Sequence, residues 1–272
     1  MGKISDALER QKKDKSLKTE RMPIGRPDDF SKREEESSPV KKTLIPDNYD
    51  PKLVVVTAPD SFEAENFKML RAQIMFARDR KRPRTIMITS AMPGDGKTFV
   101  AANLGVSIAL GIDEYVLLVD CDLRRPDLHR MLGLSNAEGL REYLSGKKNL
   151  SQLLVRTSIE KLSLLPAGSP PHNPSELLAS AAMKSFLEEI RNRYEDRFII
   201  IDTAPSQVLT EANILANFVD GIIFVVMNQK TPREMIQKAT ENLGKDKILG
   251  IVYNGYIQTY KSYGKYYKEY YK

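Results

Sequence analysis

The sequence is poor in the residues that stabilise secreted and membrane-spanning proteins. Its 272 residues include one cysteine and no tryptophan, which excludes a disulfide framework and indicates a reducing compartment. The longest uninterrupted apolar run, residues 222–227, is the length of a buried strand and far short of the ~20 residues that cross a bilayer. No apolar signal-peptide core follows Met1. The sequence therefore predicts a cytoplasmic protein.

An excess of charge is also missing from most of the chain. Residues 51–255 hold 26 Lys or Arg and 24 Asp or Glu, and residues 1–50 hold 12 and 11. The last 17 residues hold four lysines and one glutamate, which is half of the net charge of +6. The basic composition therefore predicts no nucleic-acid-binding face on the body of the protein.

The composition divides the chain into three regions, residues 1–50, 51–255 and 256–272. The first region is nearly half charged and has few large apolar side chains, so most of it is predicted to be a disordered linker. Within Lys3–Lys12, apolar residues recur at helical spacing. This pattern predicts a short helix, which either docks on a partner or has no partner.

Residues 51–255 alternate β-branched runs with helical patterns. This alternation is typical of an α/β protein with a doubly wound, mostly parallel sheet and helices on both faces. Continuous apolar strands indicate burial on both faces. The predicted strands are Arg84–Thr89, Tyr115–Asp120, Leu162–Leu165, Arg197–Asp202, Gly221–Met227 and Lys247–Tyr253. The predicted helices are Phe62–Arg78, Lys97–Leu110, Pro174–Tyr194, Leu209–Asn217 and Pro232–Leu243.

Residues 91–98, Ala-Met-Pro-Gly-Asp-Gly-Lys-Thr, match a phosphate-binding P-loop between a predicted strand and a predicted helix. Gly94 and Gly96 let backbone N–H groups turn toward phosphate oxygens, and the helix N-terminus adds partial positive charge. Lys97 would reach the β- and γ-phosphates, and the Thr98 hydroxyl would bind Mg²⁺. Taken alone, the segment could also be a glycine-rich turn without a ligand.

Two further predicted strands end in carboxylates. Asp120 and Asp122 are two residues apart, so in an extended chain they face the same side. Asp202 ends a buried apolar strand, the pattern of a Walker B strand whose carboxylate holds the hydration shell of Mg²⁺. Because the carboxyl ends of parallel strands share an edge with the P-loop, we expect these carboxylates to converge with Lys97 and Thr98.

The P-loop, the stretch Asp120–Pro126 (Asp-Cys-Asp-Leu-Arg-Arg-Pro) and the stretch Asp202–Pro205 (Asp-Thr-Ala-Pro) resemble the bacterial tyrosine kinases of capsule and exopolysaccharide synthesis. The resemblance covers residues 53–272. These kinases share their fold with the deviant P-loop ATPases of cell division and plasmid partition. Those ATPases typically carry an extra lysine where this chain has Met92, so its absence favours the kinases.

The resemblance implies a protein-tyrosine kinase that uses ATP and Mg²⁺. It implies that Asp120 assists deprotonation of the tyrosine hydroxyl, whose pKa of ~10 keeps it protonated at neutral pH. Asp122, Asp202 and Thr98 would serve the magnesium. The implied catalytic residues are Lys97, Asp120 and Asp122, and the implied nucleotide-binding residues are Gly94, Asp95, Gly96, Lys97, Thr98, Phe99 and Asn254. The runner-up is a regulatory ATPase of the cell-division type, which would position water instead of a phenol.

The family also has a Glu-x-x-Arg-x-x-Arg helix that assembles subunits into rings. Glu65, Lys68 and Arg71 match it at a spacing that keeps them near one helix face. Lys68 replaces an arginine and loses bidentate geometry, and a solvated charged face is the alternative. The resemblance implies that further copies of the chain assemble with it into a ring-like homo-oligomer. It also implies a membrane-embedded polysaccharide co-polymerase or adaptor, which activates the kinase and recruits it to the inner face of the plasma membrane. A tyrosine phosphatase is a further implied partner, and no nucleic acid is implied.

Seven tyrosines lie in the last 17 residues: Tyr256, Tyr260, Tyr263, Tyr266, Tyr267, Tyr270 and Tyr271. No aliphatic residue follows Ile257, so we expect a flexible tail. The preceding strand should be parallel and release the tail at the nucleotide edge, and a reach of ~50 Å would take it into a neighbour's site. These tyrosines are therefore the predicted phosphoacceptors. Stacking on single-stranded nucleic acid and a merely adhesive tail are the alternatives.

The remaining reactive side chains are predicted to be structural. Cys121 lies between two aspartates and is expected to be a small buried neighbour of theirs. His129 and His172 have no metal-ligating companions in the sequence, so we expect both at the surface.

Overall fold

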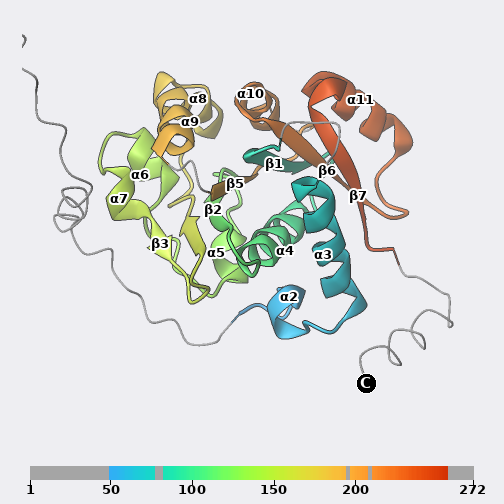
Figure 1. Cartoon of the computed structure of the whole chain (residues 1–272). Helices are drawn as coiled ribbons and strands as arrows, with labels where there is room; N and C mark the ends of the chain where they lie inside the picture. The colour runs from blue at the N-terminus through green and yellow to red at the C-terminus, as the bar shows by residue number, and fades with distance from the viewer. Residues whose placement is uncertain (1–48, 77–81, 194–196, 208–209, 257–272) are drawn as a thin grey trace, which may run out of the picture. The chain divides into compact units, whose positions relative to one another are not determined.

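The computed structural model describes residues 49–76, 82–193, 197–207 and 210–256. Within these residues, seven strands form one sheet in the order β3-β4-β2-β5-β1-β6-β7 (Figure 1). The strands are β1 (Thr85–Ser90), β2 (Tyr115–Asp120), β3 (Val155–Arg156), β4 (Leu162–Leu165), β5 (Arg197–Asp202), β6 (Gly221–Met227) and β7 (Ile248–Asn254). All pairings are parallel except that of β3 with β4. The predicted N-terminal linker up to residue 48 and the tyrosines after Tyr256 lie outside the described residues.

Helices cover both faces of this sheet, as the alternating pattern predicts (Figure 1). They are α2 (Val54–Thr57), α3 (Phe62–Met75), α4 (Lys97–Ala109), α5 (Leu128–Met131), α6 (Leu140–Leu144), α7 (Leu150–Leu153), α8 (Pro174–Leu178), α9 (Ala181–Arg193), α10 (Glu211–Leu215) and α11 (Arg233–Leu243), with 3₁₀ turns at Ala216–Phe218 and Lys245–Lys247. The doubly wound α/β fold is confirmed.

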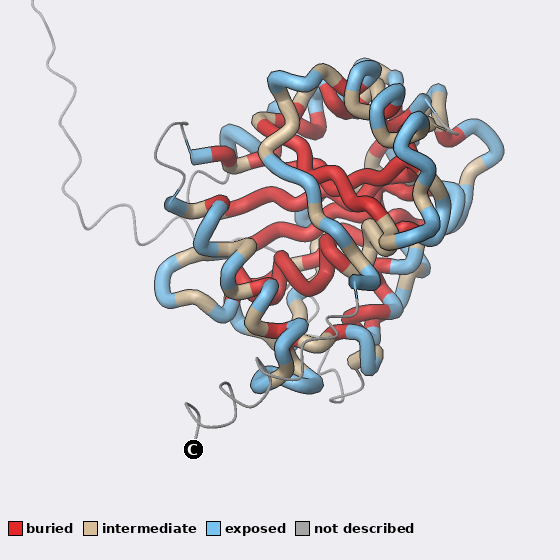
Figure 2. Tube along the Cα trace, turned by 90° about the vertical axis from the view of Figure 1, so that its right-hand side faces the viewer, coloured by how far each residue is buried: buried red, intermediate tan, exposed pale blue. Residues whose placement is uncertain are grey.

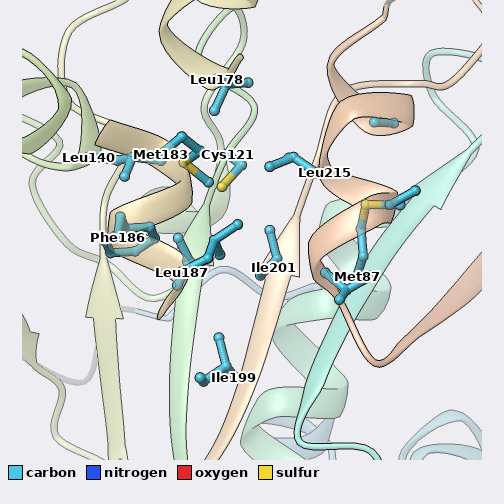
Figure 3. Close-up of a cluster of buried hydrophobic side chains, with 14 of the residues drawn as sticks. Met87, Cys121, Leu140, Leu178, Met183, Phe186, Leu187, Ile199, Ile201 and Leu215 are labelled. Atoms are coloured by element: carbon cyan, nitrogen blue, oxygen red, sulfur yellow. The ribbon is translucent and has the colours of Figure 1, made fainter. Parts of the chain in front are cut away.

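The two faces of the sheet carry two separate apolar clusters. Alternate residues of a strand point to opposite faces, so Phe198 and Ile200 of β5 join a cluster with α3, α4 and α5. Ile199 and Ile201 join the other cluster, to which Met183, Phe186 and Leu187 of α9 also belong (Figure 3). The central strands β1, β2, β5 and β6 are accordingly almost wholly buried, whereas the edge strands β3 and β7 are not (Figure 2).

The predicted helix Pro174–Tyr194 is wrong as a single element, because it is two helices. The Ser180 hydroxyl donates to the Leu177 carbonyl oxygen at 2.7 Å, and its oxygen accepts from the Met183 N–H at 3.2 Å. The side chain therefore closes α8 and caps the start of α9, a role in which serine is favoured. The break thus separates α8 (Pro174–Leu178) from α9 (Ala181–Arg193).

The short elements are the other difference from the sequence-based expectation. The antiparallel strand β3 and the helices α2, α5, α6 and α7 were not expected. Each has two to five residues, too few to show a hydrophobic period. No helix among the described residues combines the length and the apolar character that a bilayer crossing requires.

Candidate functional site

The turn between β1 and α4 has the backbone of a P-loop. Gly94 and Gly96 have φ angles of 82° and 94°, which glycine adopts without strain. A Cβ on Gly96 would overlap the side-chain amide of Asn254. That amide, at the end of β7, donates to the Asp95 carbonyl oxygen at 2.9 Å. The end of β7 therefore holds the P-loop backbone in place through the side chain of Asn254.

The Asp95 side chain has a structural task instead of a ligand contact. It is completely buried, and its two oxygens accept from the Met92 N–H at 3.1 Å and from the Thr231 hydroxyl at 2.9 Å. This predicted nucleotide-binding residue does not line the cavity described below. The carboxylate holds the P-loop to the turn between β6 and α11.

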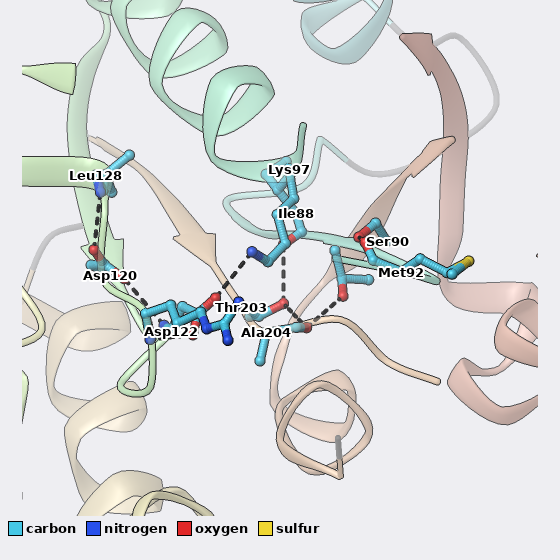
Figure 4. Close-up of polar contacts among 11 residues, drawn as sticks. Ile88, Ser90, Met92, Lys97, Asp120, Asp122, Leu128, Thr203 and Ala204 are labelled. Atoms are coloured by element: carbon cyan, nitrogen blue, oxygen red, sulfur yellow. Dashed lines mark hydrogen bonds and ion pairs between the residues drawn. The ribbon is translucent and has the colours of Figure 1, made fainter. Parts of the chain in front are cut away.

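Lys97 and Asp122 form an ion pair at the centre of the site, with Nζ and Oδ2 3.0 Å apart (Figure 4). Burial alone would lower the pKa of Lys97, but the negative charges of Asp202 and Asp122 outweigh it and raise that pKa. Lys97 is therefore an ammonium at neutral pH. The other oxygen of Asp122 accepts from the Arg125 N–H at 3.1 Å.

Asp120 is completely buried and organises the loop that follows it. Its oxygens accept from the backbone N–H groups of Asp122 at 3.1 Å and Leu128 at 3.2 Å (Figure 4). Burial, and then the charges of Asp202 and Asp122, raise its pKa well above the usual range of a carboxyl. In this conformation the side chain does not line the cavity described below.

Asp202 is the carboxylate whose charge is least satisfied. It is completely buried, and among the described residues neither oxygen has a partner in hydrogen-bond geometry. Burial raises its pKa to about 6, although the Lys97 ammonium and the nearby Thr98 hydroxyl act in the opposite direction. The next residue, Thr203, donates from its hydroxyl to the Ile88 carbonyl oxygen at 3.0 Å, which holds the segment beside β1 (Figure 4).

This donor set fits Mg²⁺. Asp120, Asp122 and Asp202 place three buried carboxylates around the single ammonium of Lys97, an imbalance that a divalent cation would offset. Among the described residues, no group of three or more His, Cys, Asp or Glu side chains could hold a metal by itself. Magnesium is usually held by one or two carboxylates with phosphate oxygens and water, so Thr98 and Asp202 are suitable ligands only with a bound nucleotide.

A cavity of about 970 Å³ opens beside the P-loop. Gly94, Gly96, Lys97, Thr98, Phe99 and Asn254, six of the predicted nucleotide-binding residues, line it. Lys52 and Arg125 line it as well, so its wall carries positive charge. The volume is in the range of cavities that hold cofactors.

Of the predictions for the remaining reactive side chains, those for Cys121 and His172 are confirmed and that for His129 is wrong. Cys121 is completely buried, as expected. His172 is exposed, but His129 is not a surface residue: only 9 % of it is exposed, and as the second residue of the short helix α5 it forms part of the cavity wall. Burial and the neighbouring Arg130 lower the pKa of His129.

The predicted oligomerisation residues lie on α3 but do not form one free charged face. Lys68 pairs with Glu65 within the helix at 3.0 Å. The guanidinium of Arg71 instead donates to the Ser107 carbonyl oxygen of α4 at 2.6 Å. Of the predicted phosphoacceptors, Tyr256 is described; it is 60 % exposed, and its ring centroid lies 6.0 Å from that of Tyr253.

Two groups of polar residues around the site were not expected from the sequence. Thr231 holds Asp95 across 136 positions of the chain. Glu211 of α10 accepts from Arg124 and from the Ser175 hydroxyl, both at 2.9 Å, which ties the loop after Asp122 to α8 and α10. Neither group forms a local motif, so only the fold brings its members together.

Comparison with known proteins gives one consistent family. A family model described as an AAA domain matches residues 83–245. The tyrosine-protein kinase YwqD of Bacillus subtilis is 37% identical over 217 residues, which are 79% of this chain and 90% of that protein.

Two solved structures give the same result. The kinase domain of the Escherichia coli tyrosine kinase ETK has a TM-score of 0.72 at 30% identity and aligns over 79% of this chain and 84% of that domain. The chimerical protein CapA2B2 has a TM-score of 0.70 at 33% identity, over 79% and 96% of the two chains.

Proposed function

Because this chain belongs to the bacterial tyrosine-protein kinases, we propose that it transfers the γ-phosphoryl group of ATP to tyrosines of its own C-terminal segment in a neighbouring copy. The observation that carries this proposal is the end of β7. Asn254 contacts the P-loop, and the segment with the predicted phosphoacceptors begins two residues later. The C-terminal segment with the predicted phosphoacceptors thus begins at the edge of the sheet that carries the P-loop.

Each strand-end residue has a distinct task in this proposal. Lys97 and the N–H groups of the P-loop bind the phosphates and neutralise charge that develops during transfer. Asp122 lies within 3.0 Å of Lys97; bound phosphates would compete with it for the ammonium and leave its carboxylate available to a metal ion. Asp120 holds the loop after β2, and a carboxyl whose pKa is raised by burial is suited to accept the phenol proton as a general base.

Magnesium would be held by Thr98, Asp122 and Asp202. When bound, it would neutralise phosphate charge and make the terminal phosphoryl group more electrophilic. The two oxygens of Asp202 that lack a described partner support this assignment.

The wider role is proposed from the same membership. We infer a ring-like homo-oligomer through the α3 surface with Glu65 and Lys68, and a membrane-embedded co-polymerase or adaptor that activates the kinase at the inner face of the plasma membrane. A tyrosine phosphatase would reverse the reaction. The process served would be the synthesis and export of capsule or exopolysaccharide. The similarity to the chimerical protein CapA2B2 is the nearest support for a protein partner.

The test is the fate of the terminal phosphate. Purified full-length chain, concentrated enough to self-associate, is incubated with Mg²⁺ and ATP, and phosphotyrosine and free orthophosphate are both measured. We expect phosphotyrosine that disappears in Lys97→Met and when all seven C-terminal tyrosines become Phe. Lys238→Met, which removes an exposed lysine of α11, should leave the signal unchanged.

The alternative of a regulatory ATPase makes the opposite prediction. It would release orthophosphate without phosphotyrosine, and the seven-fold Phe variant would behave as the wild type. The names of the relatives at 30% identity or more disfavour it.

A further inference from the structure

The turn between β6 and α11 is fixed against the P-loop. The Thr231 hydroxyl accepts from the Met227 N–H at 3.1 Å and donates to the Asp95 carboxylate at 2.9 Å. The N–H groups of Lys230 and Thr231 both donate to the Met227 carbonyl oxygen at 3.2 Å. The backbone of the turn is therefore held at both ends.

The turn contains a strained residue. Gln229 has a φ angle of 57°, and among the described residues it is the one non-glycine residue with a positive φ. Such a conformation persists where the surroundings impose it. Lys230 follows this residue directly in the turn.

The side chain of Lys230 reaches the P-loop. Its Nζ would be 2.8 Å from a Cβ placed on Gly94, so the ammonium occupies the space beside that glycine. No carboxylate of the described residues pairs with it, although Asp95 lies next to Gly94 and uses its oxygens on Met92 and Thr231. An ammonium without a carboxylate partner lies against a loop that is built to hold phosphate.

The other lysine of the site is already engaged. Lys97 pairs with Asp122 and lies in the field of three buried carboxylates. The strand ends alone present more carboxylates than ammonium groups to a polyphosphate, while Lys52 and Arg125 supply positive charge from the cavity wall. The ammonium of Lys230, beside Gly94, would add to that positive charge.

We propose that Lys230 is a nucleotide-binding residue that donates to the phosphate chain of bound ADP or ATP from the β6–α11 turn. This inference rests on nucleotide binding at the P-loop, not on the identity of the acceptor. The turn then has one function: Thr231 holds the P-loop, and Lys230 adds positive charge beside it.

The experiment measures binding, not kinase activity. The dissociation constants of ADP and ATP for the full-length chain are determined by calorimetry in low and in high salt. Lys230→Met keeps the apolar stem and removes the charge, and it should weaken both ligands about tenfold at low salt, the loss expected for one charge-assisted hydrogen bond. The loss should shrink at high salt, and Lys230→Arg should restore most of the affinity.

Lys238→Met is the matched control, because it removes one exposed lysine from α11 and should change neither constant. Affinity of Lys230→Met within twofold of the wild type would overturn the proposal, as would an equal loss in Lys238→Met. A fall in the unfolding temperature of the nucleotide-free protein that Lys230→Arg does not reverse would assign the residue to the turn's structure instead. Failure of tyrosine phosphorylation leaves all these readouts intact, so the two proposals fail separately.

Discussion

At the scale of single residues, Gly96 satisfies two constraints at once. Its φ of 94° belongs to the left-handed region, and a Cβ there would overlap the Asn254 amide. Gly96→Ala should therefore abolish measurable ADP binding and lower the free energy of unfolding by about 2–3 kcal/mol. Denaturant unfolding and calorimetry measure the two effects.

Gly146 supplies the control for Gly96. It also has a positive φ, 67°, but a Cβ there would meet nothing within 4 Å. Gly146→Ala should cost only about 1 kcal/mol of strain and leave ADP binding intact. Equal losses in the two variants would mean that backbone strain, not the contact with Asn254, explains the glycine at position 96.

The Lys97–Asp122 pair predicts that the loss of a site residue will strengthen nucleotide binding in the absence of metal. Asp122→Asn removes the carboxylate 3.0 Å from the ammonium and so frees Lys97 for phosphate. Without divalent cations, ADP should bind severalfold more tightly to the variant, whereas phosphotyrosine formation with Mg²⁺ should be lost. Asp113→Asn, an exposed change outside the cavity lining, should do neither, and weaker metal-free binding in Asp122→Asn would contradict the assignment.

At the scale of elements, Asp220 joins three pieces of the fold. Its Oδ2 accepts from the N–H groups of Arg84 and Thr85, each at 3.0 Å, and its Oδ1 accepts from the Arg191 guanidinium at 2.8 Å. It thus connects the starts of β1 and β6 with the end of α9. Asp220→Ala should lower the free energy of unfolding by about 2–3 kcal/mol, the value of hydrogen bonds to a charged group. Asp113→Ala, at an exposed position, should stay within about 0.5 kcal/mol of the wild type in the same denaturant titration.

The contact between α10 and the loop after β2 predicts an acid-sensitive contribution to stability. Burial would raise the pKa of Glu211, but hydrogen bonds from its own N–H, Arg124 and Ser175 outweigh it and lower that pKa. A carboxyl with a lowered folded-state pKa stabilises the fold above its ordinary pKa of 4.5, and this stability is lost as the pH falls. Glu211→Gln should therefore be less stable than the wild type at pH 7, and the difference should narrow by pH 3.5 in denaturant unfolding. A constant difference between the two pH values would refute the role of the charge.

The elements also explain how far the sequence could be read. β2, β4, β5 and β6 have the predicted bounds, because apolar runs of four to seven residues between turns leave little choice in a doubly covered sheet. The P-loop and the strand-end carboxylates could be found for the same reason: a parallel sheet brings its carboxyl ends together. The break at Ser180 was missed because an apolar period runs across it, and its cap is decided by one hydroxyl. Lys230 and Thr231 carry no local signal, since their contacts with residues 94 and 95 depend on strand order.

At the scale of the whole molecule, phosphorylation should change the oligomeric state. The last 17 residues carry four lysines and one glutamate, and each phosphotyrosine would add about −1.5 to −2 charges. Protein incubated with Mg-ATP should therefore dissociate into smaller species in sedimentation experiments, because the segments of neighbouring copies would repel each other. Lys97→Met under the same conditions should keep its size, and dissociation of this variant would attribute the effect to nucleotide instead.

The position of Asn254 at the end of β7 couples the C-terminal segment to the P-loop. Asn254 donates to the Asp95 carbonyl oxygen, and the chain continues directly from it to Tyr256. Any rearrangement of the C-terminal segment that shifts Asn254 must alter affinity at the P-loop, and thermodynamic reciprocity requires that an occupied P-loop bias the segment by the same free energy. The position of the C-terminal segment and the binding of nucleotide at the P-loop are thus linked through the position of Asn254.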